Sequence, residues 1–215
     1  MHPWFVAAHF ESGREIVEVA LEQLPRYLKR AVGLGELGLD HGSRTDPASH
    51  PWQEELFVRQ LEIARAHGPL PLVLHIVKAH GPALAILRRF GPFPRGGLVH
   101  SFSVSGEVAR AYLELGFTLS IGGALCRRRG FETLKRAASV LPLDRVVLES
   151  DCPDQLPDGF AAKYPGLNDP RAVFRVAQAL CQLRPEPRPR PEDVLAASAL
   201  RLRAIFELES GSKRP

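Results

Sequence analysis

Short apolar runs alternate with segments of helical periodicity, and this alternation restricts the fold more than any other feature of the sequence. The apolar runs predict strands over residues 31–39, 70–75, 96–102, 117–122 and 145–150. Strands separated by helices of this length favour right-handed crossover connections and a parallel sheet. Because the runs are almost wholly apolar, both faces of the sheet are expected to be covered. The sequence therefore predicts an α/β fold.

Helices are predicted between and after these strands. The first, over residues 12–30, is amphipathic and places Ile16, Val19, Ala20 and Leu24 on one face. Residues 49–51 open the next helix, which Gly68 ends. Further helices are expected over 81–90, 105–115, 130–140 and 168–183, the last of these capped by Asn168 and Asp169, and beyond residue 191.

The composition is that of an ordinary globular protein, since 45% of the 215 residues are hydrophobic and 24% are charged. This length suits one hydrophobic core, so residues 1–215 are predicted to form a single domain. No apolar stretch reaches the ~20 residues that span a bilayer, and the first residues lack the pattern of a signal peptide. The three cysteines are widely separated. Together these features favour a cytoplasmic protein without a membrane partner.

The chain is mildly basic, with a formal net charge of +4 and a pI of about 9.2. A basic surface attracts polyanions, which favours a substrate such as nucleic acid. A coding bias toward arginine explains the same value, so the charge alone does not select a partner. Trp4 and Phe102 are the aromatic residues that we would expect to stack on bases, if bases are bound.

Four residues of metal-binding type stand at the ends of apolar runs: Glu36, His75, His100 and Asp151. Taken singly, each has an ordinary explanation, such as a loop-capping carboxylate or a hydrogen-bonded histidine. Parallel strands deliver their carboxyl ends to one face of an α/β barrel, so the four are expected to meet there. Carboxylate and imidazole ligands fit Zn²⁺, Mn²⁺, Mg²⁺ or Fe²⁺ without distinguishing them. The pattern predicts a metal-dependent hydrolase.

Asp151 is the candidate catalytic residue because a carboxylate near a metal is a sufficient base for an activated water molecule. Period-2 alternation places Glu149 and Asp151 on the same side of their strand. Nucleophilic alternatives are weaker, since no Ser or Cys stands in a G-x-S-x-G motif and no lysine ends a strand.

Several motifs, spread in order along the chain, resemble the TatD family of metal-dependent hydrolases, many of which are deoxyribonucleases built on a TIM barrel. The matching stretches are His2-Pro3-Trp4, G-E-L-G-L-D (35–40), Q-L-E-I-A (60–64), L-P-L-V-L-H (70–75), V-H-S-F-S-V-S (99–105), L-G-F-T-L-S-I-G-G (115–123), P-L-D-R-V-V-L-E-S-D-C-P-D (142–154) and N-D-P (168–170).

The resemblance implies a TIM-type (β/α) barrel, two divalent ions in a complete site, and a DNA or other phosphate-ester substrate. It implies that Glu36 bridges the ions, that His75 and His100 bind the second ion, and that Asp151 binds the first and accepts the proton from water. Most members also carry an early H-x-H pair on their first strand, which this chain lacks. The expected fold is therefore a barrel that is incomplete at its N-terminus, with about five strands and two closing helices.

An incomplete barrel would expose strand edges, so poor solubility or oligomers through these edges are expected. A start codon assigned too far downstream and a genuine truncation both explain the missing H-x-H region. Two alternatives to a deoxyribonuclease stay open: a non-catalytic remnant that binds metal, and the same site acting on a different ester or an amide.

Overall fold

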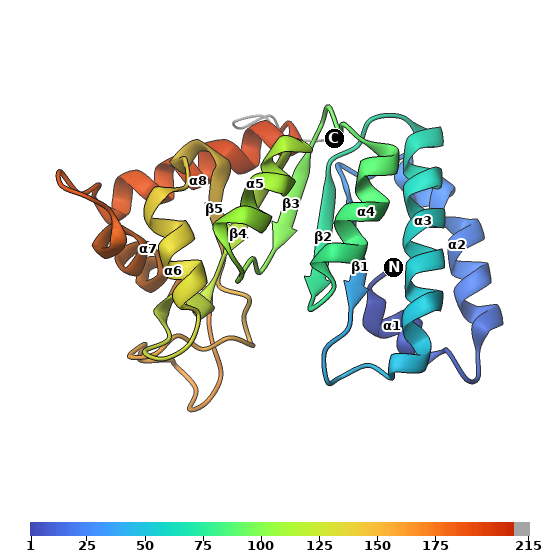
Figure 1. Cartoon of the computed structure of the whole chain (residues 1–215), viewed down its shortest axis with the longest axis horizontal. Coiled ribbons are helices and arrows are strands. Elements are labelled where there is room, and N and C mark those ends of the chain that lie inside the picture. The colour runs from blue at the N-terminus through green and yellow to red at the C-terminus, as the bar shows by residue number, and fades with distance from the viewer. Residues whose placement is uncertain (209–215) are drawn as a thin grey trace. The chain divides into compact units, whose positions relative to one another are not determined.

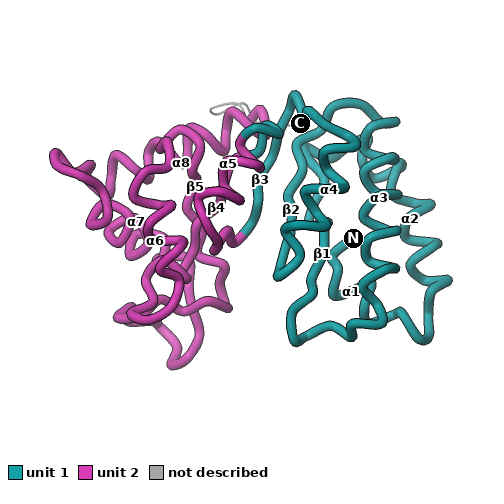
Figure 2. The backbone as a smooth tube through the Cα atoms, in the orientation of Figure 1, with its two compact units in different colours: residues 1–100, 114–117 teal, residues 101–113, 118–215 magenta. Residues whose placement is uncertain are grey.

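The computed structural model describes residues 1–208 (Figure 1). The chain divides into two compact units (Figure 2). Unit 1 comprises residues 1–100 and 114–117, and unit 2 comprises residues 101–113 and those from 118 onward. The single domain expected over residues 1–215 stays a prediction.

Unit 1 is built on three parallel strands, β1 (Leu34–Asp40), β2 (Leu72–Val77) and β3 (Gly97–His100). β1 pairs with β2, and β2 pairs with β3. The register sets His75 of β2 beside His100 of β3. The parallel sheet predicted from the apolar runs is thus confirmed for these strands, and it brings two of the predicted ligands to neighbouring positions.

Helices cover this sheet, with α3 packed against β1 and α4 against β2 (Figure 1). Buried leucines and Phe57 fill the space between the layers. The helices α1 and α2 pack in turn on α3, where Val6, Val17, Leu21 and Trp52 form a second apolar cluster. The helical elements of unit 1 are α1 (Pro3–Ala8), α2 (Arg14–Leu28), the 3-10 turn η1 (Pro47–Ser49), α3 (His50–His67) and α4 (His80–Phe90).

The buried face of α2 differs in part from the predicted one, since Leu24 packs against the apolar cluster as expected but Ile16 and Val19 do not. Val17, Leu21 and Leu28 are buried, whereas Ile16 is 50% and Val19 57% exposed. Both sets recur at helical spacing, so periodicity alone could not choose between the two apolar stripes. The cluster with Trp52 of α3 decides the orientation of α2.

Unit 2 contains β4 (Phe117–Ile121, of which Phe117 belongs to unit 1) and β5 (Val146–Leu148), which pair in parallel. The helix α8 packs against β5 and α7 (Figure 1). The remaining elements are α5 (Gly106–Glu114), η2 (Gly123–Cys126), α6 (Glu132–Val140), η3 (Leu143–Arg145), α7 (Ala172–Leu183) and α8 (Pro191–Phe206).

Each predicted strand is present, with its ends moved by at most three residues. The structure adds the short helix α1, which the sequence did not predict. The helix expected to start at Asn168 starts at Ala172 instead. Its predicted cap, Asp169, accepts hydrogen bonds from the backbone and side chain of Arg171, which closes a turn before the helix.

Among residues 1–208, no helix combines the length and the apolar composition that crossing a bilayer requires. The cysteines Cys126, Cys152 and Cys181 are free thiols. Cytoplasmic location and self-association through strand edges stay predictions.

Gly38 allows β1 and β2 to approach closely. Its φ of +145° lies outside the region that L side chains favour, and an added Cβ would lie 2.2 Å from the backbone oxygen of His75. A side chain here would push against the strand that carries His75. The position of His75 therefore requires a glycine at residue 38.

We expect Gly38→Ala to lower the free energy of unfolding by about 3 kcal/mol or more, because backbone strain and a steric clash add. Urea unfolding monitored by circular dichroism measures the change. Gly81→Ala in α4 is the control, since nothing lies within 4 Å of its added Cβ; it should be neutral or stabilising by up to ~1 kcal/mol. Equal losses in both variants would contradict the role given to Gly38.

Candidate metal centre

Three metal-binding side chains of unit 1 converge: His2, Glu36 and His75 have donor atoms within 4.8 Å of one another. Glu36 is the third residue of β1, and the pairing of β1 with β2 shifts register between Gly35 and Leu37. Glu36 is thus the bulged residue, and a β-bulge re-aims a side chain and is frequent beside active sites. Glu36 was expected at the end of its strand, but β1 continues to Asp40.

His75 is oriented by a buried carboxylate. Its Nε2 lies 3.0 Å from Oδ2 of Asp40, whose side chain is 3% exposed. Since an ionised carboxylate only accepts hydrogen bonds, Nε2 carries the proton in the neutral ring. The lone pair of Nδ1 then faces Oε2 of Glu36 at 3.4 Å. In most metal sites, a ligating histidine donates the N–H of one ring nitrogen to a carboxylate and binds the metal through the other nitrogen.

Asp40 is itself held in place by several donors. Its Oδ2 accepts the indole N–H of Trp4 at 2.5 Å, and its Oδ1 accepts the backbone N–H of Gly42 at 2.7 Å. Burial raises the pKa of Asp40, but hydrogen bonds, led by that with His75, outweigh it and lower the pKa to about 2. Asp40 is therefore ionised at neutral pH and available to orient His75.

His2 is close enough to be a ligand, but its hydrogen bonds favour another role. Its Nδ1 accepts the backbone N–H of Trp4 at 3.1 Å, so the proton of the neutral ring is on Nε2. That nitrogen faces Nδ1 of His75 at 3.1 Å and Oε2 of Glu36 at 3.4 Å. A protonated nitrogen cannot bind a metal. We infer that His2 donates a hydrogen bond in this centre, while Glu36 and His75 supply lone pairs.

His100 is the last residue of β3, as predicted, and its ring lies beside that of His75. The ring centroids are 6.2 Å apart and the planes are inclined by 27°. The structure therefore places Glu36, His75 and His100 in unit 1, with Glu36 and His75 in the convergent group and the His100 ring beside that of His75.

Imidazole donors control the charge of Glu36. The hydrogen bond from His2, followed by that from His75 when its ring is protonated, outweighs the effect of burial and holds the pKa of Glu36 well below its usual value. The carboxyl is thus ionised at any pH near neutrality. One ionised carboxylate beside the oriented imidazole of His75 is a pair of ligands that fits a divalent transition metal.

The protonation of His75 predicts how metal binding depends on pH. Burial lowers the pKa of His75, but hydrogen bonds that its ring donates to the carboxylates of Asp40 and Glu36 raise the pKa above its usual value of 6.5. In the metal-free chain, protonated His75 thus contributes stability below pH 6.5, and this is lost as pH rises through the raised pKa. A metal requires the neutral ring, so it competes with this proton.

We therefore expect the stabilisation by Mn²⁺, measured as the difference in Tm between metal and chelator, to grow from pH 6 to pH 8. Thermal unfolding followed by circular dichroism at each pH gives this difference. A difference that is independent of pH would argue against His75 as a ligand. In His75→Gln, the pH-dependent increase should disappear.

Asp151 lies in unit 2, after β5, and adopts a left-handed backbone with φ of 54°. Its Oδ2 accepts a hydrogen bond from the Gln155 amide, which also donates to the Ser101 hydroxyl at 2.5 Å. β5 ends at Leu148, so the period-2 alternation that paired Asp151 with Glu149 does not reach Asp151. The carboxylate is instead positioned by the turn and by Gln155.

Two buried or half-buried groups fix the turn around Asp151. Asn168 is 5% exposed, and its amide donates to the backbone oxygens of Ser150 at 2.5 Å and Asp154 at 2.8 Å, on either side of Asp151. Glu149 accepts the backbone N–H of Ser101 at 2.7 Å and the Ser120 hydroxyl. The sequence offered Asn168 only as a helix cap, and its part in holding this turn was missed.

The two aromatic residues proposed for base stacking differ in exposure, and stacking by Trp4 stays a prediction. Phe102 is 1% exposed, so its ring cannot receive a base, and that expectation was wrong. Trp4 is 37% exposed, but its indole N–H is bound to Asp40 and the Arg44 guanidinium lies 4.7 Å from the centre of its ring.

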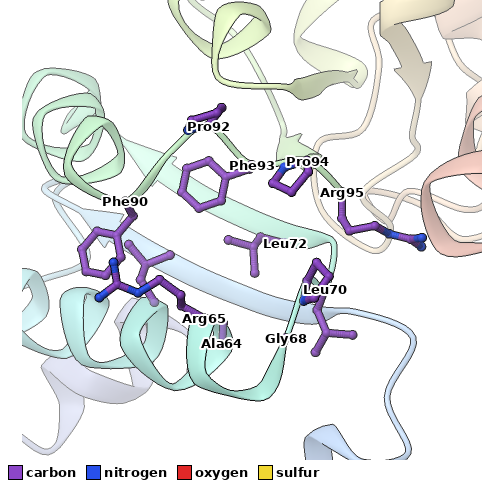
Figure 3. Close-up of a pocket in the computed structure, with 12 residues that line it drawn as sticks. Ala64, Arg65, Gly68, Leu70, Leu72, Phe90, Pro92, Phe93, Pro94 and Arg95 are labelled. Atoms are coloured by element: carbon purple, nitrogen blue, oxygen red, sulfur yellow. The ribbon is translucent and has the colours of Figure 1, made fainter.

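An apolar cavity of about 350 Å³ in unit 1 lies away from these ligands (Figure 3). It opens where β2 starts, with Leu72, Phe90 and Phe93 on its walls. Its other walls are prolines, glycine, alanine, leucines and two arginines, so its lining contains no carboxylate, imidazole or thiol. This cavity therefore does not belong to the metal centre.

Comparison with known proteins identifies what the chain resembles. A family model described as TatD related DNase matches residues 1–206. Over 187 residues, the chain is 33% identical to YjjV of Escherichia coli K12, an uncharacterized metal-dependent hydrolase, and the match covers 87% of this chain and 68% of YjjV. It is 35% identical over 180 residues to a 3′-5′ ssDNA/RNA exonuclease TatD of Erwinia billingiae, covering 82% of this chain and 66% of that protein.

The crystal structure of Escherichia coli YjjV is similar to this structure, with a TM-score of 0.77 and 31% identity. The match covers 89% of this chain and 71% of that one. This likeness confirms the predicted α/β fold of TIM-barrel type.

Proposed function

Because the chain belongs to the TatD family of metal-dependent hydrolases, we propose that it hydrolyses phosphodiester bonds in single-stranded nucleic acid. The substrate is suggested by the exonuclease TatD of Erwinia billingiae, which is similar over most of this chain. The mildly basic charge of the chain is compatible with a polyanion.

The observation that carries the proposal is the oriented pair of Glu36 and His75. Glu36 is ionised, and His75 turns the lone pair of Nδ1 toward it with Asp40 behind. With His100, these residues would hold one divalent ion, and Asp151 would contribute to a second. When bound, such ions lower the pKa of water and offset the negative charge of a phosphodiester.

The chain's own residues supply positioning and proton transfer. Asp40 fixes the ring of His75, and His2 presents an Nε2–H that can donate to an anionic oxygen. Asp151 accepts the proton of the attacking water at a carboxylate oxygen. Gln155 binds Asp151 directly, and Asn168 holds the turn after β5 in which Asp151 lies.

Incubation of the purified chain with a 5′-labelled single-stranded oligonucleotide tests the proposal. The assay is run with Mg²⁺, Mn²⁺, Zn²⁺ or Fe²⁺ and repeated with a chelator. We expect cleavage that depends on at least one of these metals. Parallel preparations of His75→Gln, which should be inactive, control for contaminating nucleases.

Each alternative predicts a different result. A metal-binding remnant would bind about one ion per chain and show no turnover with any substrate. A hydrolase of another class would cleave chromogenic esters or amides with the same metals and leave the oligonucleotide intact. Either outcome would overturn the proposed nuclease activity.

A further inference from the structure

A small pocket of unit 2 lies beside Asp151 and has no assigned role. Its volume is about 240 Å³, below the 300–1,000 Å³ typical of pockets that enclose a whole small molecule. It is lined by Ser101, Ser103, Ala124, Arg127, Phe131 and Gln155. A pocket of this size suits one unit of a longer molecule.

Gln155 connects this pocket to the candidate catalytic carboxylate. The Gln155 amide donates both to the Ser101 hydroxyl, which lines the pocket, and to Oδ2 of Asp151. A ligand in the pocket is therefore one side chain away from Asp151. The pocket is placed to receive the part of a substrate next to the bond that is cleaved.

The rim of the pocket is strongly basic. Arg127 lines the pocket, and Arg128 and Arg129 follow it directly in the sequence; all three are exposed. Asp158 balances part of this charge, since it pairs with the Arg127 guanidinium at 3.1 Å and accepts the backbone N–H of Arg128 at 2.9 Å. Three guanidinium groups against one carboxylate leave an excess of positive charge in the segment that contributes Arg127 to the pocket, which favours an anion such as a phosphate.

An aromatic ring stands beside these arginines. Phe131 lines the pocket and is 40% exposed, with a left-handed backbone whose φ is 57°. Such a backbone is uncommon for a phenylalanine. A cationic rim next to an exposed aromatic ring is the combination with which proteins bind single-stranded nucleic acid, because unpaired bases stack on the ring.

We propose that this pocket binds one nucleotide of a single-stranded nucleic acid, with its phosphate at Arg127–Arg129 and its base on Phe131. The inference rests on the proposed nuclease function and names the residues that would hold the strand beside Asp151. Stacking requires a base that is not already stacked in a duplex, so a single strand is the expected ligand.

The test measures binding of a fluorescein-labelled oligothymidylate to the full chain by fluorescence anisotropy, in the presence of a chelator. Under these conditions no hydrolysis occurs, and binding is separated from catalysis. Phe131→Ala should weaken binding by about 5- to 100-fold, the loss typical of one stacked base. Phe174→Ala is the matched control, since Phe174 of α7 is also 40% exposed and should not affect binding.

A second pair of variants separates charge from structure. Arg127→Ala should weaken binding several-fold and make the dependence of log K on log salt shallower by about 0.7. Asp158→Asn removes the same ion pair but leaves Arg127 in place, so it should strengthen binding. If the ion pair were only structural, both variants would weaken binding.

The proposal is overturned if the chain does not bind the oligonucleotide, or if Phe131→Ala and Arg127→Ala bind like the wild type. Failure of the proposed function gives a different result: binding would change as predicted, but no metal would induce cleavage. Conversely, if the wild type cleaved the oligonucleotide with metal and both variants bound it like the wild type, the role of the pocket would be refuted. The proposed nuclease activity would still stand.

Discussion

Asp151→Asn should reduce metal-dependent hydrolysis by about 10²- to 10⁴-fold, the range in which a positioned general base contributes. Asparagine has nearly the same shape, and its amide oxygen can still accept the hydrogen bond from Gln155. It cannot take a proton from water near neutral pH. Steady-state cleavage of a labelled oligonucleotide measures the loss, which should be found in kcat.

The matched control is Asp154→Asn, three residues along the same turn. Asp154 is exposed, and the turn uses its backbone oxygen rather than its carboxylate to bind Asn168. We expect activity close to that of the wild type. Equal activity of Asp151→Asn and Asp154→Asn would show that the proton acceptor had been assigned to the wrong residue.

Glu36→Gln should weaken metal binding by more than about 100-fold. The substitution removes the negative charge of the centre, and the ionised form of Glu36 is the one that His2 and His75 stabilise. Asp40→Asn acts only through the orientation of His75, so a loss of about 10- to 100-fold is expected. Titration calorimetry with Mn²⁺ measures both effects.

Glu22→Gln in α2 serves as the control, because Glu22 is exposed and belongs to unit 1 without any part in the centre. Its affinity for Mn²⁺ should equal that of the wild type. If the affinity of Glu36→Gln for Mn²⁺ equalled that of Glu22→Gln, the centre would not include Glu36.

The alternation of apolar runs and helical segments was sufficient to predict the strands and most helices. The runs at β1 and β2 are apolar enough to require cover on both faces, and helices of sufficient length separate them. The buried face of α2 could not be predicted, since two apolar stripes compete and contact with Trp52 selects one. The short helix α1 was missed because six residues carry too little periodicity.

Residue type and strand position together led us to predict Glu36, His75 and His100 as ligands, and the structure places them on β1, β2 and β3. The partners that orient them were not predictable in the same way. The hydrogen bond to Asp40 decides which ring nitrogen of His75 keeps its lone pair, and the hydrogen bond from Trp4 decides which nitrogen of His2 is protonated. Both depend on interatomic distances, which the spacing of residues in the sequence does not give. The bulge at Glu36 was also hidden, although the glycine before it was a signal of irregular pairing.

The structure changed which aromatic residues we expect to stack on bases. Phe102 follows a predicted ligand in the sequence, but it is buried in the core. Phe131 stands in an arginine-rich segment with no strand signal, and only its left-handed backbone and the adjacent pocket draw attention to it. Exposure of a single ring depends on tertiary packing, which composition does not give.

The most direct test of the metal centre is anomalous diffraction from crystals grown with Zn²⁺ and measured at the zinc absorption edge. We expect a peak about 2.0–2.2 Å from both the Glu36 carboxylate and Nδ1 of His75, the usual distances of zinc to oxygen and nitrogen ligands. Nε2 of His75 should remain bonded to Asp40. Absence of a peak beside these two residues in crystals that bind zinc elsewhere would contradict the centre described above.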